Sequence, residues 1–106
     1  MSRLKTNGEY RHLRSHSQSH FGQWIIIDYA RFSNEESRYG ITVTKKFGKA
    51  HERNRFKRIV REAFRLAPLP EGIWMNIRPL KKPQSTLDIK SDLDGFHTQQ
   101  RAKTSC

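Results

Sequence analysis

The sequence has very little cysteine and no long apolar run, and each absence excludes a class of protein. Its single cysteine, Cys106, is the last of 106 residues, so no internal disulfide can form. The longest apolar run covers residues 24–27, whereas a membrane-spanning helix needs roughly 20 apolar residues. The first residues also lack the apolar core of a secretory signal. We therefore expect a cytoplasmic protein with no membrane partner.

Acidic residues are scarce as well. Asp and Glu number 10 against 21 Lys and Arg, which gives a formal net charge of +11 and an isoelectric point near 10.4. An excess of this size favours a polyanionic partner, and nucleic acid is the candidate left once a membrane is set aside. A chain of this length predicts one domain with a modest core, without a large enzyme cleft or a small-molecule substrate.

No group of residues in the sequence predicts catalysis or metal binding by the protein itself. A Ser–His–Asp arrangement, a Cys near a His and a glycine-rich phosphate loop are all absent. His12, His16 and His20 have the spacing of one helix face, but the residues after Ser15 are poor helix formers. We therefore expect no catalytic residue, no metal site and no cofactor bound by protein ligands.

Most of the positive charge lies in residues 45–65. Nine of these 21 residues are Lys or Arg and two are Glu, which leaves +7 of the total +11. The apolar residues within and just after this stretch recur at the spacing of one buried helix face: Phe56, Ile59, Val60, Ala63, Phe64 and Ala67. The sequence therefore predicts an amphipathic helix. Its opposite face would carry Asn54, Arg58, Arg61 and Arg65, with Arg55 and Lys57 on the flanks.

The basic face of this helix is expected to bind RNA. A solvated face usually mixes charges of both signs, whereas this one is almost entirely positive. Arginine outnumbers lysine on it, and the planar guanidinium can hold two phosphate oxygens at once. The candidate RNA-binding residues of the stretch are Lys45, Lys46, Lys49, Arg53, Asn54, Arg55, Lys57, Arg58, Arg61 and Arg65.

The order of residues in this stretch carries a more specific signal. It reads Lys45-Lys46-x-Gly48-x-Ala50, then Arg53-Asn54-Arg55, then Lys57-Arg58-x-x-Arg61-Glu62-x-Phe64-Arg65. This pattern resembles the signature of the bacterial ribonuclease P protein component. His51 departs from it, because the family usually has an apolar residue there. The resemblance covers about residues 3–98 and is strongest over residues 38–65.

The resemblance implies a subunit that works with a large catalytic RNA. Together they would remove the 5′ leader from precursor tRNA, and the RNA would supply the Mg²⁺-dependent chemistry. By similarity, the residues that contact this ribonuclease P RNA are Lys46, Arg53, Asn54, Arg55, Arg58 and Arg61. A small basic ribosomal or RNA-chaperone protein is the alternative. It would share the charge and the size, but would not be expected to carry the whole pattern.

A second site is expected for the single-stranded leader. In the family, a groove between the first helix and the sheet takes the leader, and its aromatic position on that helix matches Tyr10. A second aromatic, expected one turn later, is Arg14 here, so a phosphate contact would replace stacking. Thr42 and Thr44 share one face of a predicted strand and can bond a nucleic-acid backbone. These four residues form the candidate leader site.

The remaining pattern predicts the element order α-β-β-α-β-α. Further helices are expected over residues 8–15 and 88–98, and strands over residues 24–30, 38–45 and 73–78. Asn7 is the expected cap of the first helix, residues 32–37 are the expected turn of a hairpin, and Pro68 and Pro70 are expected to end the basic helix. Residues 99–106 are predicted to be a frayed tail.

This order favours a single α+β domain over residues 1–106, with an ordered core over about residues 3–98. A small mixed sheet with the helices on one face would satisfy it. The resemblance implies an α-β sandwich in which the strands before and after the basic helix are parallel. It also implies a left-handed crossover between them, although nearly all such crossovers in proteins are right-handed.

Overall fold

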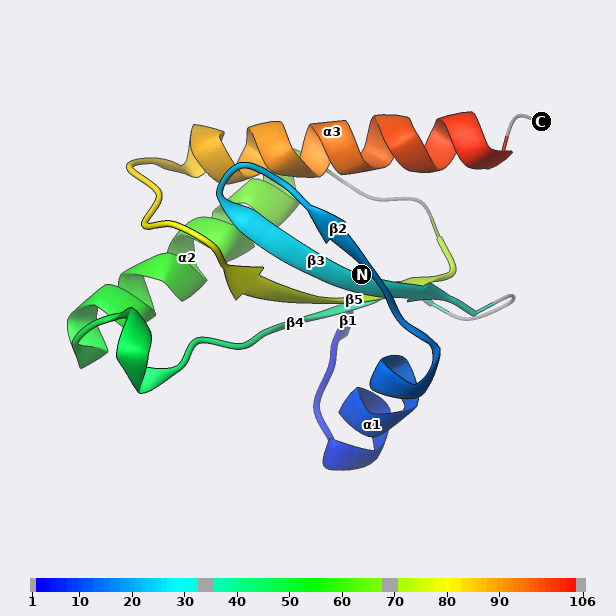
Figure 1. Ribbon diagram of the computed structural model, residues 1–106, viewed down its shortest axis with the longest axis horizontal. Helices are drawn as coiled ribbons and strands as arrows, with labels where there is room; N and C mark the ends of the chain where they lie inside the picture. Colours follow the sequence, from blue (N-terminus) through cyan, green and yellow to red (C-terminus); the bar gives the residue numbers. More distant parts are fainter. Residues whose placement is uncertain (1, 33–35, 68–70, 105–106) are drawn as a thin grey trace.

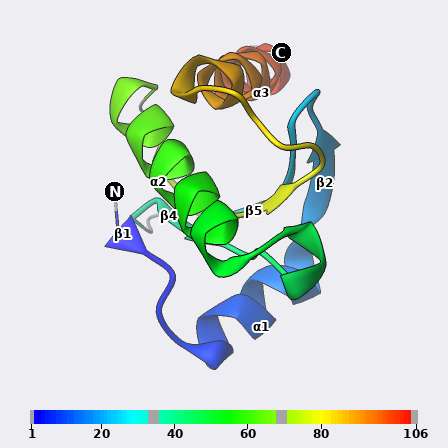
Figure 2. The same ribbon diagram turned by 90° about the vertical axis from the view of Figure 1, so that its left-hand side faces the viewer.

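The computed structural model describes residues 2–32, 36–67 and 71–104. The elements are β1 (Ser2–Arg3), α1 (Asn7–His16), β2 (Gln18–Phe21), β3 (Ile25–Arg31), β4 (Arg38–Ile41), the 3₁₀ helix η1 (Lys45–Phe47), α2 (Ala50–Leu66), β5 (Ile73–Pro79) and α3 (Thr86–Thr104). Helices α2 and α3 cover one face of a mixed sheet and α1 lies on the other (Figures 1 and 2). The predicted α-β sandwich is confirmed.

The expectation that all helices share one face of the sheet is wrong. The reason is a second, smaller core under α1, in which Leu4 and Leu13 pack with Ala30 of β3 and Trp74 of β5. These two sheet residues point away from the main core, so the sheet has apolar surface on both faces. A helix is therefore needed on each side to bury it.

The strands have the order β1-β4-β5-β3-β2. β5 is antiparallel to β3 and parallel to β4, so β3 and β4 do not form the hairpin that was predicted. Burial explains the order, because Ile73, Met75 and Ile77 of β5 face the main core while Trp74 faces the other side. A strand with two buried faces is most stable inside the sheet. Residues 33–35 of the expected turn lie outside the described residues.

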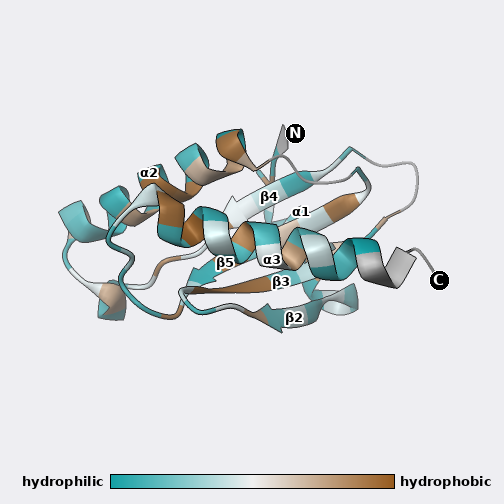
Figure 3. Ribbon diagram, turned by 90° about the horizontal axis from the view of Figure 1, so that it is seen from above, coloured by the Kyte–Doolittle hydropathy of each residue, from teal (hydrophilic) through white to brown (hydrophobic). Residues whose placement is uncertain are grey.

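β4, α2 and β5 form the crossover that the resemblance implies. The two strands are parallel, with Arg38 opposite Trp74 and Ile41 opposite Ile77. Figures 1 and 3 together show that the chain passes from β4 over α2 to β5 in the left-handed sense. This crossover places the basic helix on the same face of the sheet as α3.

The main core lies between the sheet and the two helices α2 and α3. The six apolar residues that predicted the basic helix are all buried, with exposed fractions of 7% or less. Along α3, Ile89, Leu93 and Phe96 recur at the same helical spacing and are each 0% exposed. The 3.6-residue periodicity therefore identified the buried face of both helices correctly.

The helix ends differ from those predicted. Thr6, not Asn7, caps α1, because the Thr6 side chain accepts from the Glu9 amide at 3.1 Å and Glu9 accepts from the Thr6 amide at 3.0 Å.

α3 continues to Thr104, so the predicted frayed tail is wrong up to that residue. Gln100 explains the extension, since it is 1% exposed and accepts from Arg31 Nη2 at 2.8 Å. Pro68 and Pro70 lie outside the described residues.

β2 is a strand that the sequence did not predict. It pairs antiparallel with β3, from Gln18 opposite Tyr29 to Phe21 opposite Ile26. β2 forms the edge of the sheet and most of its residues are exposed, so its sequence is polar and lacks the β-branched residues typical of a buried strand. A polar edge strand of this kind has the composition of a loop.

Candidate nucleic-acid interface

The outward face of α2 is basic, as predicted. Arg58 and Arg65 are exposed together with Asn54, and Arg61 is half-buried beside them. Arg53 and Lys57 are half-buried on one flank of the helix. Because the other face of α2 is packed on the core, its exposed guanidinium groups can bind phosphate without any rearrangement of that core.

The two glutamates of α2 both accept hydrogen bonds from other parts of the protein. Lys82 Nζ donates to the Glu52 carboxylate at 2.6 Å, and the Thr86 hydroxyl donates to the Glu62 carboxylate at 2.8 Å. The hydrogen bond from Lys82 lowers the pKa of Glu52, so this carboxylate stays paired and ionised. Lys82, between β5 and α3, and Thr86, the first residue of α3, thus engage the two glutamates in hydrogen bonds within the protein.

Arg55 has an intramolecular role that the sequence did not reveal. Its guanidinium donates to the carbonyl oxygens of Pro83 at 3.1 Å and Gln84 at 2.8 Å. These bonds tie α2 to the turn that leads into α3. A guanidinium has five N–H donors, so further donors remain for a phosphate, and an RNA contact by Arg55 stays a prediction.

η1, which precedes α2 in the chain, extends the basic surface past the N-terminal end of that helix. Lys45 and Lys46 are exposed on η1, and Lys49 is exposed at the N-cap position of α2. The ring of Phe47 packs on that of Phe56 with a centroid distance of 5.3 Å. This contact packs η1 against the core, so the backbone that carries Lys45 and Lys46 is held in place.

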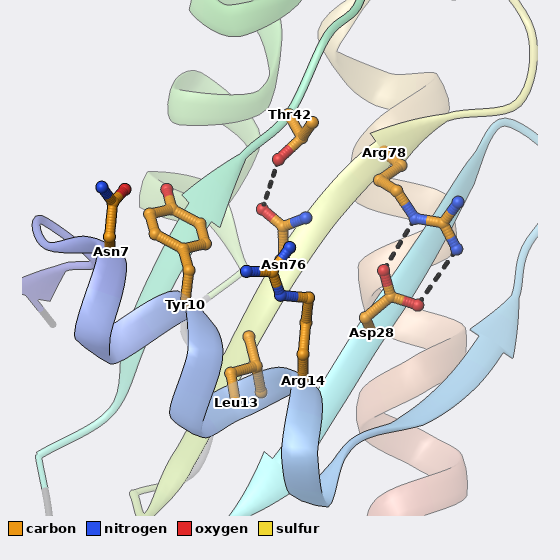
Figure 4. A pocket seen from close by; sticks show the side chains of 8 residues that line it. All are labelled: Asn7, Tyr10, Leu13, Arg14, Asp28, Thr42, Asn76 and Arg78. Carbon is orange, nitrogen blue, oxygen red and sulfur yellow. Dashed lines mark hydrogen bonds and ion pairs between the residues drawn. The ribbon is translucent and has the colours of Figure 1, made fainter.

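A groove of about 470 Å³ lies between α1 and the sheet (Figure 4). Its lining residues are Asn7, Tyr10, Leu13, Arg14, Asp28, Thr42, Asn76 and Arg78. Three of the four candidate leader residues, Tyr10, Arg14 and Thr42, are therefore brought together. Thr44 does not line the groove, because β4 ends at Ile41 and Thr44 is the N-cap of η1.

The floor of the groove is a polar network that sequence reasoning missed. Arg78 donates to Asp28 through Nε at 2.7 Å and through Nη2 at 3.1 Å, and Thr42 Oγ1 donates to Asn76 Oδ1 at 3.1 Å (Figure 4). The hydrogen bond to Asp28 raises the pKa of Arg78. The alternation of side chains along β5 could have predicted this network, because it places Asn76 and Arg78 on the face of the sheet that points away from the core residues Met75 and Ile77.

Tyr10 supplies the aromatic wall of the groove. Its side chain is half-buried, and this burial raises the pKa of the Tyr10 hydroxyl. The phenol therefore stays neutral at physiological pH and can both stack and hydrogen-bond. Arg14 lies one turn further along α1 and is exposed, as a phosphate contact requires.

No helix in residues 2–32, 36–67 and 71–104 is long and apolar enough to cross a membrane. Within the same residues, no group of three or more His, Cys, Asp and Glu side chains could hold a metal ion.

Comparison with known proteins decides the family. The family model described as Ribonuclease P matches residues 1–98. The chain belongs to the Ribonuclease P protein family. The ribonuclease P protein component of Chlamydia trachomatis serovar L2 is 78% identical over 51 residues, which are 47% of this chain and 42% of that relative. That of Fusobacterium nucleatum is 41% identical over 66 residues, which are 62% of this chain and 60% of the relative.

Solved structures of Ribonuclease P family proteins share the whole fold. The RNase P protein of Thermotoga maritima matches with a TM-score of 0.78 and 27% identity, over 92% of this chain and 96% of that chain. The Staphylococcus aureus protein matches with a TM-score of 0.74 and 26% identity, over 95% and 94%. The resemblance inferred from the basic stretch is therefore confirmed. The alignments with the curated relatives are shorter, and the first spans less than half of that relative's length.

Proposed function

We propose that this chain is the protein subunit of ribonuclease P, the ribonucleoprotein that removes the 5′ leader from precursor tRNA. In this role η1 and α2 bind the catalytic RNA, and the groove under α1 binds the leader. The observation that carries the proposal is the basic face of α2, whose two glutamates are engaged elsewhere, on a chain that belongs to the Ribonuclease P family. The chain is expected to act in the cytoplasm.

The two surfaces supply different parts of the function. The exposed cations of α2 and η1 neutralise RNA phosphates and release counterions, which supplies affinity without base recognition. The groove combines an aromatic ring, an exposed arginine and amide and hydroxyl groups, which suits a single strand whose bases are unstacked. Mg²⁺ belongs to the RNA partner in this proposal, and the protein lowers the Mg²⁺ requirement by contributing fixed positive charge.

Reconstitution with a bacterial ribonuclease P RNA at low Mg²⁺ tests the proposal. RNA-free protein alone should leave precursor tRNA intact, and RNA alone should cleave poorly. Together they should cleave at the mature 5′ end, and the protein with Arg58→Ala should need more Mg²⁺ for the same rate. Failure of the protein to lower the Mg²⁺ requirement would count against the assignment.

The same assay separates this function from a ribosomal or RNA-chaperone role. A general chaperone should also accelerate an unrelated self-cleaving RNA under the same conditions. The proposed subunit should stimulate the ribonuclease P RNA and leave the unrelated RNA unchanged. Equal stimulation of the two RNAs would favour the chaperone.

A further inference from the structure

The face of the sheet that forms the groove floor continues past the groove to the edge strand β2. Phe21 of β2 is opposite Ile26 of β3, and Ile26 is opposite Arg78 of β5. Residues directly opposite one another on paired strands point to the same face of the sheet. Phe21 therefore lies in one row with Arg78, two strands away at about 10 Å.

Contacts of the neighbouring residues confirm which face Phe21 occupies. The hydroxyl of Ser19 donates to Asp28 at 2.8 Å, so Ser19 is on the groove side. The ring of His20 contacts Phe96 of α3 with a centroid distance of 5.3 Å, so His20 is on the opposite side. Because side chains alternate along a strand, Phe21 points to the groove side with Ser19.

Phe21 is unusually exposed for an aromatic residue in this protein. Its exposed fraction is 68%, whereas every other Phe, Tyr and Trp is at least half-buried; all of these rings lie within the described residues. An exposed phenylalanine does not stabilise the folded chain, because its ring is left in water. The exposed ring is therefore available for a binding contact beside a groove whose lining includes Arg14.

The hairpin that carries Phe21 is held rigidly. The carboxylate of Asp92 on α3 accepts from the amides of Gln23 at 3.1 Å, Trp24 at 2.7 Å and Ile25 at 3.0 Å. Gly22, next to Phe21, lies so close to this carboxylate that a β-carbon there would be 2.6 Å from Asp92 Cγ. The turn between β2 and β3 is thus hydrogen-bonded to α3, and this fixes the backbone next to Phe21.

We propose that Phe21 is a stacking platform for an unstacked base of a single-stranded RNA that leaves the groove across β5 and β3. The proposal rests on the proposed function and extends the leader path beyond the groove. Arg14 on α1 supplies a charge for the backbone of the same strand, and Arg78 in the same row keeps N–H donors beyond the two that it gives to Asp28. Phe21 thereby provides, from β2, the second aromatic that is missing where α1 carries Arg14.

The test compares precursor tRNAs with leaders of increasing length, bound to the holoenzyme reconstituted with ribonuclease P RNA. For the parent protein, affinity should rise with leader length and then level off. Phe21→Ala should remove the last part of this rise, with a loss of about 5- to 100-fold for the longest leaders. Binding of mature tRNA should not change. Leu87→Ala is the matched control, because Leu87 is 67% exposed and lies on α3.

Two more variants separate stacking from simple apolar contact. Phe21→Tyr keeps the aromatic face and should restore parental affinity, whereas Phe21→Leu keeps apolar surface without a π-face and should not. A 2-aminopurine base moved along the leader should be quenched at one position by the parent protein and regain fluorescence with Phe21→Ala. Thermal melting of each variant checks that the fold is intact, as expected for so exposed a side chain.

The outcomes are distinguishable from a failure of the proposed function. If the parent holoenzyme cleaves precursor tRNA but Phe21→Ala keeps the full leader-length dependence, the platform is refuted and the function stands. Full rescue by Phe21→Leu would also refute stacking. A parent protein that self-associates through Phe21 at assay concentrations, with leader affinity unaffected by Phe21→Ala, would assign the ring to a contact between two copies and overturn the proposal.

Discussion

The Tyr10 ring lies directly against the backbone of Gly40, where an added β-carbon would stand 2.8 Å from the ring carbon Cζ. That distance is too short for any real contact, so a side chain at this point of β4 and the ring of Tyr10 cannot both keep their places. The absence of a side chain at residue 40 is thus what allows Tyr10 to form the wall of the groove.

Gly40→Ala should displace Tyr10 and weaken leader binding. Because the obstructing atoms belong to the far end of a flexible side chain, the ring can move and the fold should be retained. The affinity for precursor tRNA with a leader should fall by about 5- to 100-fold, and Tyr10→Ala should produce a similar loss, since each variant removes one stacking face. Binding of mature tRNA should change much less.

Gly8→Ala is the control for that comparison. Gly8 also lies on α1, but a β-carbon there would meet only Thr6 Oγ1, at 3.8 Å. The substitution should leave leader affinity unchanged and stabilise the helix by up to about 1 kcal/mol. If Gly40→Ala and Gly8→Ala bind the leader equally well, Tyr10 does not form the leader site.

The two faces of α2 should respond differently to truncation. Phe56 is 1% exposed, and Phe56→Ala should lower the free energy of unfolding by about 3–5 kcal/mol. Arg58 is exposed, and Arg58→Ala should change the same quantity by less than about 0.5 kcal/mol. Urea denaturation of both variants provides the comparison. Equal losses in the free energy of unfolding for the two variants would show that the buried and exposed faces of α2 are assigned wrongly.

The glycine beside Asp92 should be intolerant of substitution. In Gly22→Ala the new β-carbon would push the Asp92 carboxylate away from the amides of Gln23, Trp24 and Ile25. Since the bond to Ile25 is buried, losing a partner there should cost about 1–3 kcal/mol. The urea midpoint of Gly22→Ala should fall accordingly.

Gly95→Ala provides the contrasting case. Gly95 lies within α3 and a β-carbon there would meet nothing within 4 Å, so the substitution should raise stability by about 0.5–1 kcal/mol. If Gly22→Ala and Gly95→Ala change the urea midpoint equally, the hydrogen bonds from the turn amides to Asp92 do not stabilise the fold as proposed.

The parts of the fold that could be predicted from the sequence were those encoded by local periodicity. The burial of Phe56 and Phe64 follows from the 3.6-residue repeat of α2, and the alternation of Ile73, Met75 and Ile77 follows from the two-residue repeat of β5. Both patterns are read within one element. The proposal that residues 45–65 bind RNA rests on the same kind of local evidence.

The parts that could not be predicted depend on which strands become neighbours. The pairing of β5 between β3 and β4 joins residues distant in sequence, and it is decided by competition for the centre of the sheet. That pairing places Asp28 beside Arg78 and Thr42 beside Asn76, so the groove floor emerges only with the register. β2 was missed because its polar residues match those of a loop, and with it the position of Phe21.

The salt dependence of binding to ribonuclease P RNA tests the central claim most directly. If about six of the nine cations in residues 45–65 contact phosphates, log K against log salt should have a slope of about −4 to −5 from this element. Arg58→Ala and Arg65→Ala should each flatten the slope by about one unit. Lys90→Ala, which removes a cation paired with Asp94 on α3, should leave it nearly unchanged. Parental slopes for both arginine variants, with a flatter slope for Lys90→Ala, would show that α2 is not the RNA-binding surface.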